Sequence, residues 1–242
     1  MKDSRLNNEI EHGKYLIEHG AGETWNWETP AGKLRWQRRV KMLRDIIRPG
    51  SEVLELGCGT GYFTRELVQS GAHIIAIDIS PELIEEAKNV IKDPNIRFKI
   101  DNAYEMSFPS GAFDHVVGSS VLHHLEIREA LSEIFRVLKS GGSIAFTEPN
   151  MMNPQIAIQK NIPSIKRRMG DSPDETAFFK WQIRHLLSRA GFTSVRVVTF
   201  DFLHPAVPPK LISTVSWLGR AAEKIPLLRG IAGSLYITAR KP

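Results

Sequence analysis

The sequence of 242 residues contains a single cysteine, Cys58. One thiol cannot form an intramolecular disulfide, and a zinc site built on several cysteines is excluded as well. The chain also lacks any run of about 18 apolar residues, the length that a membrane-spanning helix requires. Its first fifteen residues, MKDSRLNNEIEHGKY, have no apolar stretch of the kind found in secretory signals. These absences predict an intracellular protein, with the cytoplasm as the default location.

Neither sign of charge dominates the composition. The 32 lysines and arginines against 27 acidic residues give a net charge of +5. This mild excess permits an anionic partner, such as nucleic acid or an acidic lipid surface, without requiring one. The apolar fraction of 42% and the charged fraction of 24% are typical of a soluble globular protein. The length suits one α/β domain with additional capping elements.

Short apolar runs alternate with helical patterns from residue 52 onward. The runs expected to form strands are EVLEL, HIIAID, IRFKI, FDHVVGS, SIAFTEP, VRVVTF and GSLYITAR. Helical stretches of about 10 to 15 residues lie between them, and one of these, REALSEIFRVLKSGG, is expected to continue to its glycines. The alternation predicts a parallel sheet of about seven strands with helices on both faces.

Three segments lie outside this alternation, within what we expect to be a single domain over residues 1–242. Residues 1–34 are polar, helical and broken by HGAGETWNWETPAG, and are expected to form a lid with Trp25 and Trp27. Residues 150–172 and 204–231 are expected to be insertions that cap the substrate site. The second insertion combines an apolar helix face with lysine and arginine. It is expected to cap an apolar substrate, to lie on a membrane surface, or to pack at the sheet edge.

The stretch VLELGCGTGYFT, residues 53–64, places three glycines between a strand and a helix. Gly57, Gly59 and Gly61 allow backbone angles closed to other residues and let a ligand lie against the peptide plane. The N–H groups of the first helical turn then face that ligand. The dinucleotide fingerprint G-x-G-x-x-G requires a glycine where this chain has Tyr62, which weakens an NAD interpretation without excluding it.

Two acidic residues favour a different ligand. Asp78 ends the second expected strand, where a carboxylate can accept hydrogen bonds from a ribose diol. Glu55 lies just before the glycines, where it would repel a pyrophosphate but suit a positively charged ligand. S-adenosylmethionine carries such charge on its sulfonium and amino groups. The alternative is that Glu55 faces solvent or caps a neighbouring helix.

Five stretches, in order, resemble the motifs of class I S-adenosylmethionine-dependent methyltransferases, in the small-molecule and ubiquinone–menaquinone methyltransferase-like branch. They are VLELGCGTGYFT, IIAIDIS, IDNAYEMSF, GAFDHVVGSSVLHHL and RVLKSGGSIAFTEP. The resemblance extends from about residue 35 to 200, with a final strand near the C-terminus. It implies a Rossmann-like, doubly wound α/β fold whose seven-stranded sheet is mostly parallel and has an antiparallel last strand.

The resemblance also implies how S-adenosylmethionine is bound, with S-adenosylhomocysteine as product and no metal. The implied cofactor-binding residues are Glu55, Gly57, Cys58, Gly59, Gly61, Asp78, Ile79, Asn102, Ala103 and Ser119. Many relatives have aspartate where this chain has Asn102. Its amide oxygen can still accept a bond from the adenine amino group, but without charge assistance, at a cost of about 1 kcal/mol. Cys58 is expected to be a small residue in a tight turn rather than a redox group.

His123 and His124 are the candidate catalytic residues. They follow the fourth strand at the carboxyl edge of the sheet, and some similar small-molecule O-methyltransferases use a histidine there as general base. The alternative is that one packs on the cofactor and the other is solvated. His12, His19 and His204 have no metal-ligand spacing and are expected at the surface.

Seven basic residues crowd one expected helix: Lys33, Arg35, Arg38, Arg39, Lys41, Arg44 and Arg48. A solvated helix face is the favoured interpretation, and a site for an anionic substrate or lipid headgroup is the alternative. Nucleic acid is an unfavoured partner, since the sequence after the fourth strand lacks the Asn/Asp-Pro-Pro-aromatic signature of DNA base methylation.

The function predicted from these features is methyl transfer from S-adenosylmethionine to a small or lipid-like acceptor, with an oxygen atom as the expected site of methylation. Peripheral membrane contact is compatible with it. The sequence leaves two alternatives open: an NAD-type oxidoreductase, and a non-catalytic scaffold with the methyltransferase fold. Retention of Glu55, the glycines and Asp78 argues against the scaffold.

Overall fold

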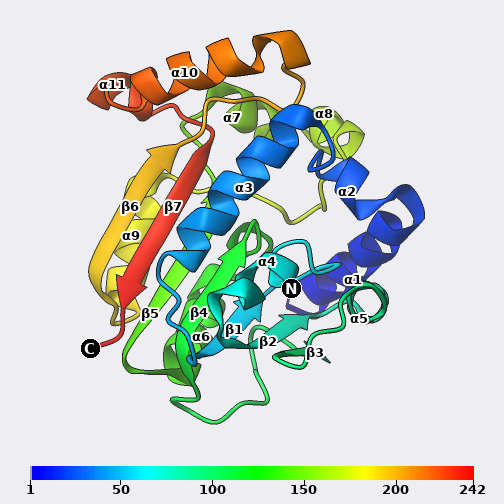
Figure 1. Ribbon diagram of the computed structural model, residues 1–242, viewed down its shortest axis with the longest axis vertical. Coiled ribbons are helices and arrows are strands. Elements are labelled where there is room, and N and C mark those ends of the chain that lie inside the picture. The colour runs from blue at the N-terminus through cyan, green and yellow to red at the C-terminus, as the bar shows by residue number, and fades with distance from the viewer. Residues whose placement is uncertain (1) are drawn as a thin grey trace.

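A seven-stranded sheet forms the centre of the protein (Figure 1). The computed structural model describes residues 2–242, with side chains from residue 4 onward. The strands are β1 (Glu52–Leu56), β2 (His73–Asp78), β3 (Ile96–Ile100), β4 (Phe113–Ser119), β5 (Leu138–Pro149), β6 (Thr193–Phe200) and β7 (Ser234–Arg240). Their order across the sheet is β3-β2-β1-β4-β5-β7-β6. Only β7 runs antiparallel to its neighbours among these strands, so the predicted fold class is confirmed.

Helices cover both faces of this sheet. The α-helices are α1 (Lys2–His19), α2 (Ala21–Thr24), α3 (Pro30–Arg44), α4 (Thr64–Leu67), α5 (Pro81–Val90), α6 (Ile127–Val137), α7 (Pro154–Asn161), α8 (Pro163–Arg168), α9 (Lys180–Arg189), α10 (Ile212–Ala222) and α11 (Pro226–Arg229). Short 3₁₀ turns form η1 (Val68–Ser70), η2 (Leu122–His124) and η3 (Pro209–Leu211).

The two faces have separate hydrophobic clusters. Side chains of α3, α4 and α5 pack on one face, where they meet Val53 of β1. Side chains of α6 and α9 pack on the other, where they meet Leu54, the next residue of the same strand. Because successive side chains of a strand point to opposite faces, a strand covered on both sides is apolar throughout. This explains why consecutive residues of β1 are buried, whereas β3, at the edge of the sheet, is less deeply buried.

The start of β5 differs from the expectation. The helix predicted to continue up to the glycines of REALSEIFRVLKSGG ends at Val137, and the chain enters β5 directly at Leu138. The register between β4 and β5 shifts just after this point. A Cβ on Gly142 would lie 2.8 Å from the carbonyl oxygen of Lys139, so this glycine permits a close backbone approach. The predicted extent of the helix was therefore wrong, because the glycines serve a strand irregularity.

Helix α1 lies against the N-terminal end of α5. A Cβ on Gly13 would approach the Oγ of Ser80 to 2.3 Å, so the glycine allows this contact. Ser80 caps α5 by accepting a hydrogen bond from the N–H of Leu83, and Pro81 occupies the first turn, where its missing N–H costs no hydrogen bond. None of the helices within residues 2–242 combines the length and apolarity needed to cross a membrane.

Candidate functional site

A cavity of about 680 Å³ follows the edge of the sheet where the parallel strands end. Its floor comes from the segments after each of the strands β1 to β6 and from the start of β7. Residues of α1, α3, α7 and the segment between α2 and α3 form its walls. The ends of parallel strands are the usual place for a ligand in an open α/β sheet. One continuous space therefore reaches from β3 at one edge of the sheet to β6 at the other.

The glycine turn forms part of this floor. Gly57, Gly59 and Gly61 have φ values of 67°, 53° and 84°, in the left-handed region that favours glycine. Gly57, Cys58 and Gly59 line the cavity, whereas Gly61 faces the opposite way. A Cβ on Gly61 would lie 2.4 Å from the side chain of Ile91. The third glycine thus permits packing of the turn, and the first two expose backbone to a ligand.

Asp78 lies at the cavity with its carboxylate oriented by backbone. One oxygen accepts the N–H of Gly59 at 2.9 Å, and the other accepts the N–H of Ser80 at 3.0 Å. Burial raises the pKa of Asp78, although these two hydrogen bonds oppose the rise. The side chain is only partly buried, and each oxygen retains acceptor capacity. The geometry is suited to receiving hydroxyl groups from the cavity.

Glu55 is placed differently. Its side chain is buried below the glycine turn rather than in the cavity lining, and its Oε2 has no hydrogen-bond partner. Burial raises the pKa of Glu55 to about 8, so the carboxyl group is mostly protonated at neutral pH. The solvated position considered for this residue is therefore wrong. A role beside a cationic ligand remains a prediction and requires the carboxyl group to ionise.

The other predicted cofactor residues divide into two groups. Ile79, Ala103 and Ser119 line the cavity. Asn102 does not, because its Oδ1 accepts the N–H of Tyr104 at 3.0 Å in a local turn. Asp101 lines the cavity beside it. A contact between the Asn102 amide and adenine remains a prediction that would require this turn to open.

Both histidines of η2 line the cavity, and both lie beside carboxylates. Nδ1 of His123 lies 2.6 Å from Glu148, and its Nε2 lies 3.2 Å from Glu175. Nδ1 of His124 lies 2.9 Å from Glu9 of α1. Burial opposes protonation of His124, but the carboxylates of Glu175 and Glu9 outweigh it and raise its pKa to about 9. His124 is therefore a cation at neutral pH.

Glu148 and Glu175 belong to a network that joins distant elements. Glu148, near the end of β5, accepts the N–H groups of Val121, Leu122 and His123 and fixes the chain after β4. Glu175 pairs with the buried Lys160 of α7, which also lies 2.9 Å from Asp171. The network ties α7 and the segment after α8 to the cavity floor.

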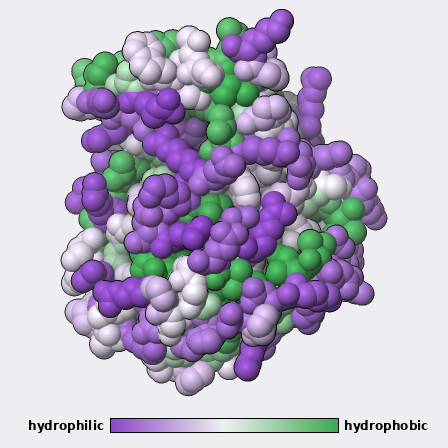
Figure 2. Space-filling view, viewed as in Figure 1, coloured by the Kyte–Doolittle hydropathy of each residue, from purple (hydrophilic) through white to green (hydrophobic). Residues whose placement is uncertain are grey.

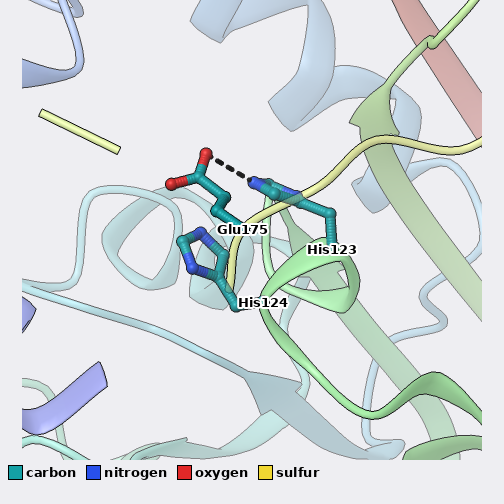
Figure 3. Close-up of side chains that lie close together, drawn as sticks. All are labelled: His123, His124 and Glu175. Atoms are coloured by element: carbon teal, nitrogen blue, oxygen red, sulfur yellow. Dashed lines mark hydrogen bonds and ion pairs between the residues drawn. The ribbon is translucent and has the colours of Figure 1, made fainter. Parts of the chain in front are cut away.

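Figure 3 shows how closely His123, His124 and Glu175 approach one another. Their ligand atoms all lie within 4.8 Å, a spacing that a metal ion would fit. Glu175 is, however, neutralised by Lys160, and His124 is protonated at neutral pH. A metal requires unprotonated imidazole and a free carboxylate. The chemistry of this group therefore suits a network of ion pairs better than a metal site.

The opposite end of the cavity is lined by two arginines of α3 and by Asp201, just after β6. Arg35 Nε and Arg39 Nη2 each lie 2.9 Å from the same oxygen of Asp201. Arg39 is buried and its guanidinium lies over the ring of Trp27, 5.5 Å from the centroid. Burial lowers the pKa of Arg39 to about 10 despite the attraction of Asp201, which still leaves it charged at neutral pH.

The predicted basic helix is thus divided by the fold. Lys33, Lys41 and Arg48 are exposed, as a solvated face requires, while Arg35 and Arg39 line the cavity. Arg38 and Arg44 are half-buried, and Arg38 pairs with Glu223. Figure 2 shows hydrophilic side chains in a band across this face of the protein. His12 is half-buried in the cavity lining, so its predicted surface position was wrong, whereas His204 is exposed as predicted and lies at the cavity rim.

The aromatic residues of the expected lid reach the glycine turn. A Cβ on Gly59 would lie 2.9 Å from the ring of Trp25. Trp25 and Trp27 both line the cavity, and Trp27 meets Phe63 edge to face. Sequence reasoning missed Lys160, Glu175 and Asp201, which lie on segments without a recognisable motif. Lys160 and Asp201 are signalled only by a charge among apolar neighbours in the sequence, and Glu175 lies in a polar stretch that gives no such signal.

Comparisons with known proteins show the family to which the chain belongs. A methyltransferase domain model matches residues 54–146. The chain is 35% identical over 158 residues to an uncharacterised methyltransferase of Synechocystis sp., covering 62% of this chain and 70% of that protein. It is 29% identical over 203 residues to the 2-methyl-6-phytyl-1,4-hydroquinone methyltransferase of the same organism, covering 82% of this chain and 63% of that relative.

A solved structure shares the fold across nearly the whole chain. It is a SAM-dependent methyltransferase of Thermotoga maritima, with a TM-score of 0.70 at 17% identity, covering 94% of this chain and 99% of that one. The protein therefore belongs to the class I S-adenosylmethionine-dependent methyltransferases. This membership confirms the resemblance identified from the motifs and displaces the NAD-type oxidoreductase and the non-catalytic scaffold.

Proposed function

We propose that the protein transfers a methyl group from S-adenosylmethionine to a hydroxyl oxygen of a small or lipid-like acceptor. The observation that carries this proposal is the single cavity that joins the glycine turn and Asp78 to a separate region lined by Trp27 and Arg35. The two regions differ in chemistry, since carboxyl groups of Asp78 and Asp101 line the first and the guanidinium groups of Arg35 and Arg39 line the second. Two different ligands are therefore expected to meet between them.

The first region suits the cofactor. Asp78 would accept the ribose hydroxyls, while Gly57 and Gly59 would let the methionine end lie on the backbone. Ile79 and Ala103 would contact the adenine. When bound, the cofactor supplies an electrophilic methyl group. The chain supplies alignment and exclusion of water, which are the main protein contributions to such a displacement.

The acceptor hydroxyl must lose a proton during transfer. In this structure neither His123 nor His124 can act as a general base without first losing a proton or a hydrogen-bond partner. His124 is already protonated at neutral pH, and Nε2 of His123 must exchange Glu175 for the acceptor. Glu148 would then hold the other ring nitrogen and fix the tautomer, as carboxylates do for catalytic histidines.

A lipid-like acceptor is favoured by the outer surface of α10 and α11. Exposed apolar side chains gather there: Leu211, Trp217, Leu218, Ile225, Leu227, Leu228 and Ile231. Lys210, Arg220, Lys224 and Arg229 lie among them, and Figure 2 shows hydrophobic residues at this end of the molecule. Only residues 204–206 of the second insertion line the cavity. Exposed apolar side chains together with basic ones are suited to binding the surface of an anionic membrane. A cytoplasmic protein could reach such a surface from the cytoplasmic side.

The test is a transfer assay with methyl-labelled S-adenosylmethionine and a prenylated dihydroxybenzoate, with the unprenylated dihydroxybenzoate alongside. Labelled product is expected, with the methyl group on oxygen by NMR. A methyl group on ring carbon would overturn the oxygen assignment, and no S-adenosylhomocysteine binding by calorimetry would overturn the cofactor assignment. In the same assay, His123→Gln and His124→Gln should reduce turnover with unchanged cofactor affinity. Full turnover in both would contradict a base role.

A further inference from the structure

Three of the four non-glycine residues with positive φ in the described chain line the cavity. They are Asn26, Ser120 and Asp201, with φ values of 59°, 57° and 78°. Such angles are unfavourable for residues with a side chain, and they concentrate at functional sites. Asp201 is the most notable because its backbone is also fixed, with its N–H donated to Glu223 and its carbonyl accepting from Gly233. The fold holds this carboxylate in place against a conformational cost.

Asp201 forms ion pairs with two arginines, Arg35 and Arg39. Its carboxylate is buried, and the two guanidinium groups of Arg35 and Arg39 keep its pKa below the ordinary value against the effect of burial. One carboxylate cannot neutralise two cations, so the group retains a net positive charge. A buried unbalanced charge is costly unless a further partner compensates it. Among the described residues that line the cavity at this end, no second carboxylate contacts Arg35.

The two arginines are not equivalent. Arg39 uses one terminal nitrogen on the carbonyl of Arg35 and the other on Ser234 and Asp201. Arg35 contacts Asp201 through Nε, and its two terminal nitrogens donate no hydrogen bond to any described residue. Its side chain is 19% exposed, at the cavity wall. The paired terminal nitrogens of an arginine match a carboxylate or phosphate in a bidentate arrangement.

The groups next to Arg35 add an aromatic surface and do not neutralise its positive charge. Trp27 lies beneath Arg35, 6.0 Å from the guanidinium carbon to the ring centroid. Gln155 of α7 and His204 contact each other across the cavity at 2.8 Å. Burial and the nearby Arg35 lower the pKa of His204, so it is neutral at pH 7 and adds no further positive charge. An aromatic surface beside a free guanidinium suits an acceptor with a flat ring and a compact oxyanion.

We propose that Arg35 is the binding residue for a compact oxyanion, a carboxylate or a phosphate, carried by the methyl acceptor. This rests on the proposed function, because it names the acceptor that the second region of the cavity takes. Asp201 and Arg39 act as positioning residues that orient Arg35. The acceptor is thus an acidic molecule whose oxyanion lies at the β6 side of the cavity and whose methylated atom points toward the glycine turn.

The test uses the protein saturated with S-adenosylhomocysteine and three probes at constant ionic strength: benzoate, phenyl phosphate and the neutral benzyl alcohol. Calorimetry should show at least one of the two anions binding ten-fold or more tightly than benzyl alcohol. Tighter binding of benzoate would indicate an acceptor with a carboxylate, and tighter binding of phenyl phosphate would indicate an acceptor with a phosphate. Arg35→Gln should remove this preference, while Arg35→Lys should retain part of it because charge remains without the paired nitrogens.

Lys33→Gln is the matched control, since it removes one positive charge from an exposed position on the same helix. It should leave the preference for anions unchanged. Equal binding of anions and benzyl alcohol to the unmodified protein would overturn the proposal, as would equal weakening by Arg35→Gln and Lys33→Gln. Binding of S-adenosylhomocysteine is measured for every variant. If the unmodified protein does not bind S-adenosylhomocysteine, the proposed function is contradicted instead. Binding of S-adenosylhomocysteine by Arg35→Gln and Arg35→Lys shows that those variants are folded.

Discussion

Glu55 shows how burial changes the chemistry of one side chain. The family resemblance implies a carboxylate near the cofactor, but burial raises the pKa of this group to about 8 in the free protein. A desolvated carboxyl group remains protonated until a positive charge approaches it. The absence of a partner for its Oε2 leaves it able to respond to such a charge.

Cofactor binding is therefore expected to release a proton near pH 7. If the cofactor's ammonium group lowers the pKa of Glu55, up to about one proton should leave per molecule bound. Calorimetry in phosphate and Tris buffers measures this release, because the apparent heat changes with the ionisation enthalpy of the buffer. Glu55→Gln should abolish the difference between buffers. Glu52→Gln on the same strand is the control, and buffer-independent heat in the unmodified protein would contradict the prediction.

Helices α10 and α11 present a surface that the fold of the domain does not require. Leu227 is 89% exposed and Trp217 is 64% exposed, whereas Ile212 and Gly219 of α10 face the protein. Ile212 packs with Ala31 and Leu203, which fixes the helix to the domain. The outward apolar side chains are thus free to enter the interfacial region of a membrane.

Flotation with liposomes tests this role. The protein is expected to float with vesicles containing anionic lipid and to remain below neutral vesicles at moderate salt, because the basic residues add electrostatic attraction. The double variant Trp217→Ser, Leu227→Ser should reduce the bound fraction several-fold without changing cofactor affinity. Val90→Ser, which removes an exposed apolar residue at the end of α5, is the control. Equal recovery with and without anionic vesicles would refute membrane contact.

At the scale of the whole molecule, two groups give the stability a defined pH dependence. Glu55 and His124 have pKa values raised to about 8 and about 9. A raised pKa means that the folded protein binds a proton more tightly than the unfolded chain, so the contribution is present at low pH and lost as pH rises through the folded value. His12, His115 and His204 have lowered pKa values, and their opposite effect is confined to pH below about 6.5.

The free energy of unfolding should therefore fall between about pH 6.5 and 9. One pKa unit corresponds to about 1.4 kcal/mol, so the two groups together contribute a few kcal/mol. Urea unfolding of the cofactor-free protein across this range measures the slope. The double variant Glu55→Gln, His124→Gln should flatten it, whereas the exposed His19→Gln should not. A stability that rises over this range would contradict the assignment.

Much of the cofactor half could be predicted from the sequence, because its information is local. The glycines, Asp78 and Ile79 follow strands directly, and parallel strands bring their ends to one edge of the sheet. The seven expected strands were also confirmed, since short segments rich in apolar residues alternate with helical segments along the chain. Gly61 and Asn102 show the limit of this approach. Both fit a motif, but packing turns Gly61 away from the cavity and a local hydrogen bond occupies Asn102.

The sequence by itself determined the alternating pattern, the glycine turn and the family, because each depends on residues that are near one another along the chain. Only the tertiary structure decided which charges meet. Arg35 and Asp201 are 166 positions apart, and His123 and Glu175 are 52 apart. Burial then sets their protonation and leaves one guanidinium free at the cavity. Such properties arise from desolvation and packing, which no local pattern of residues records.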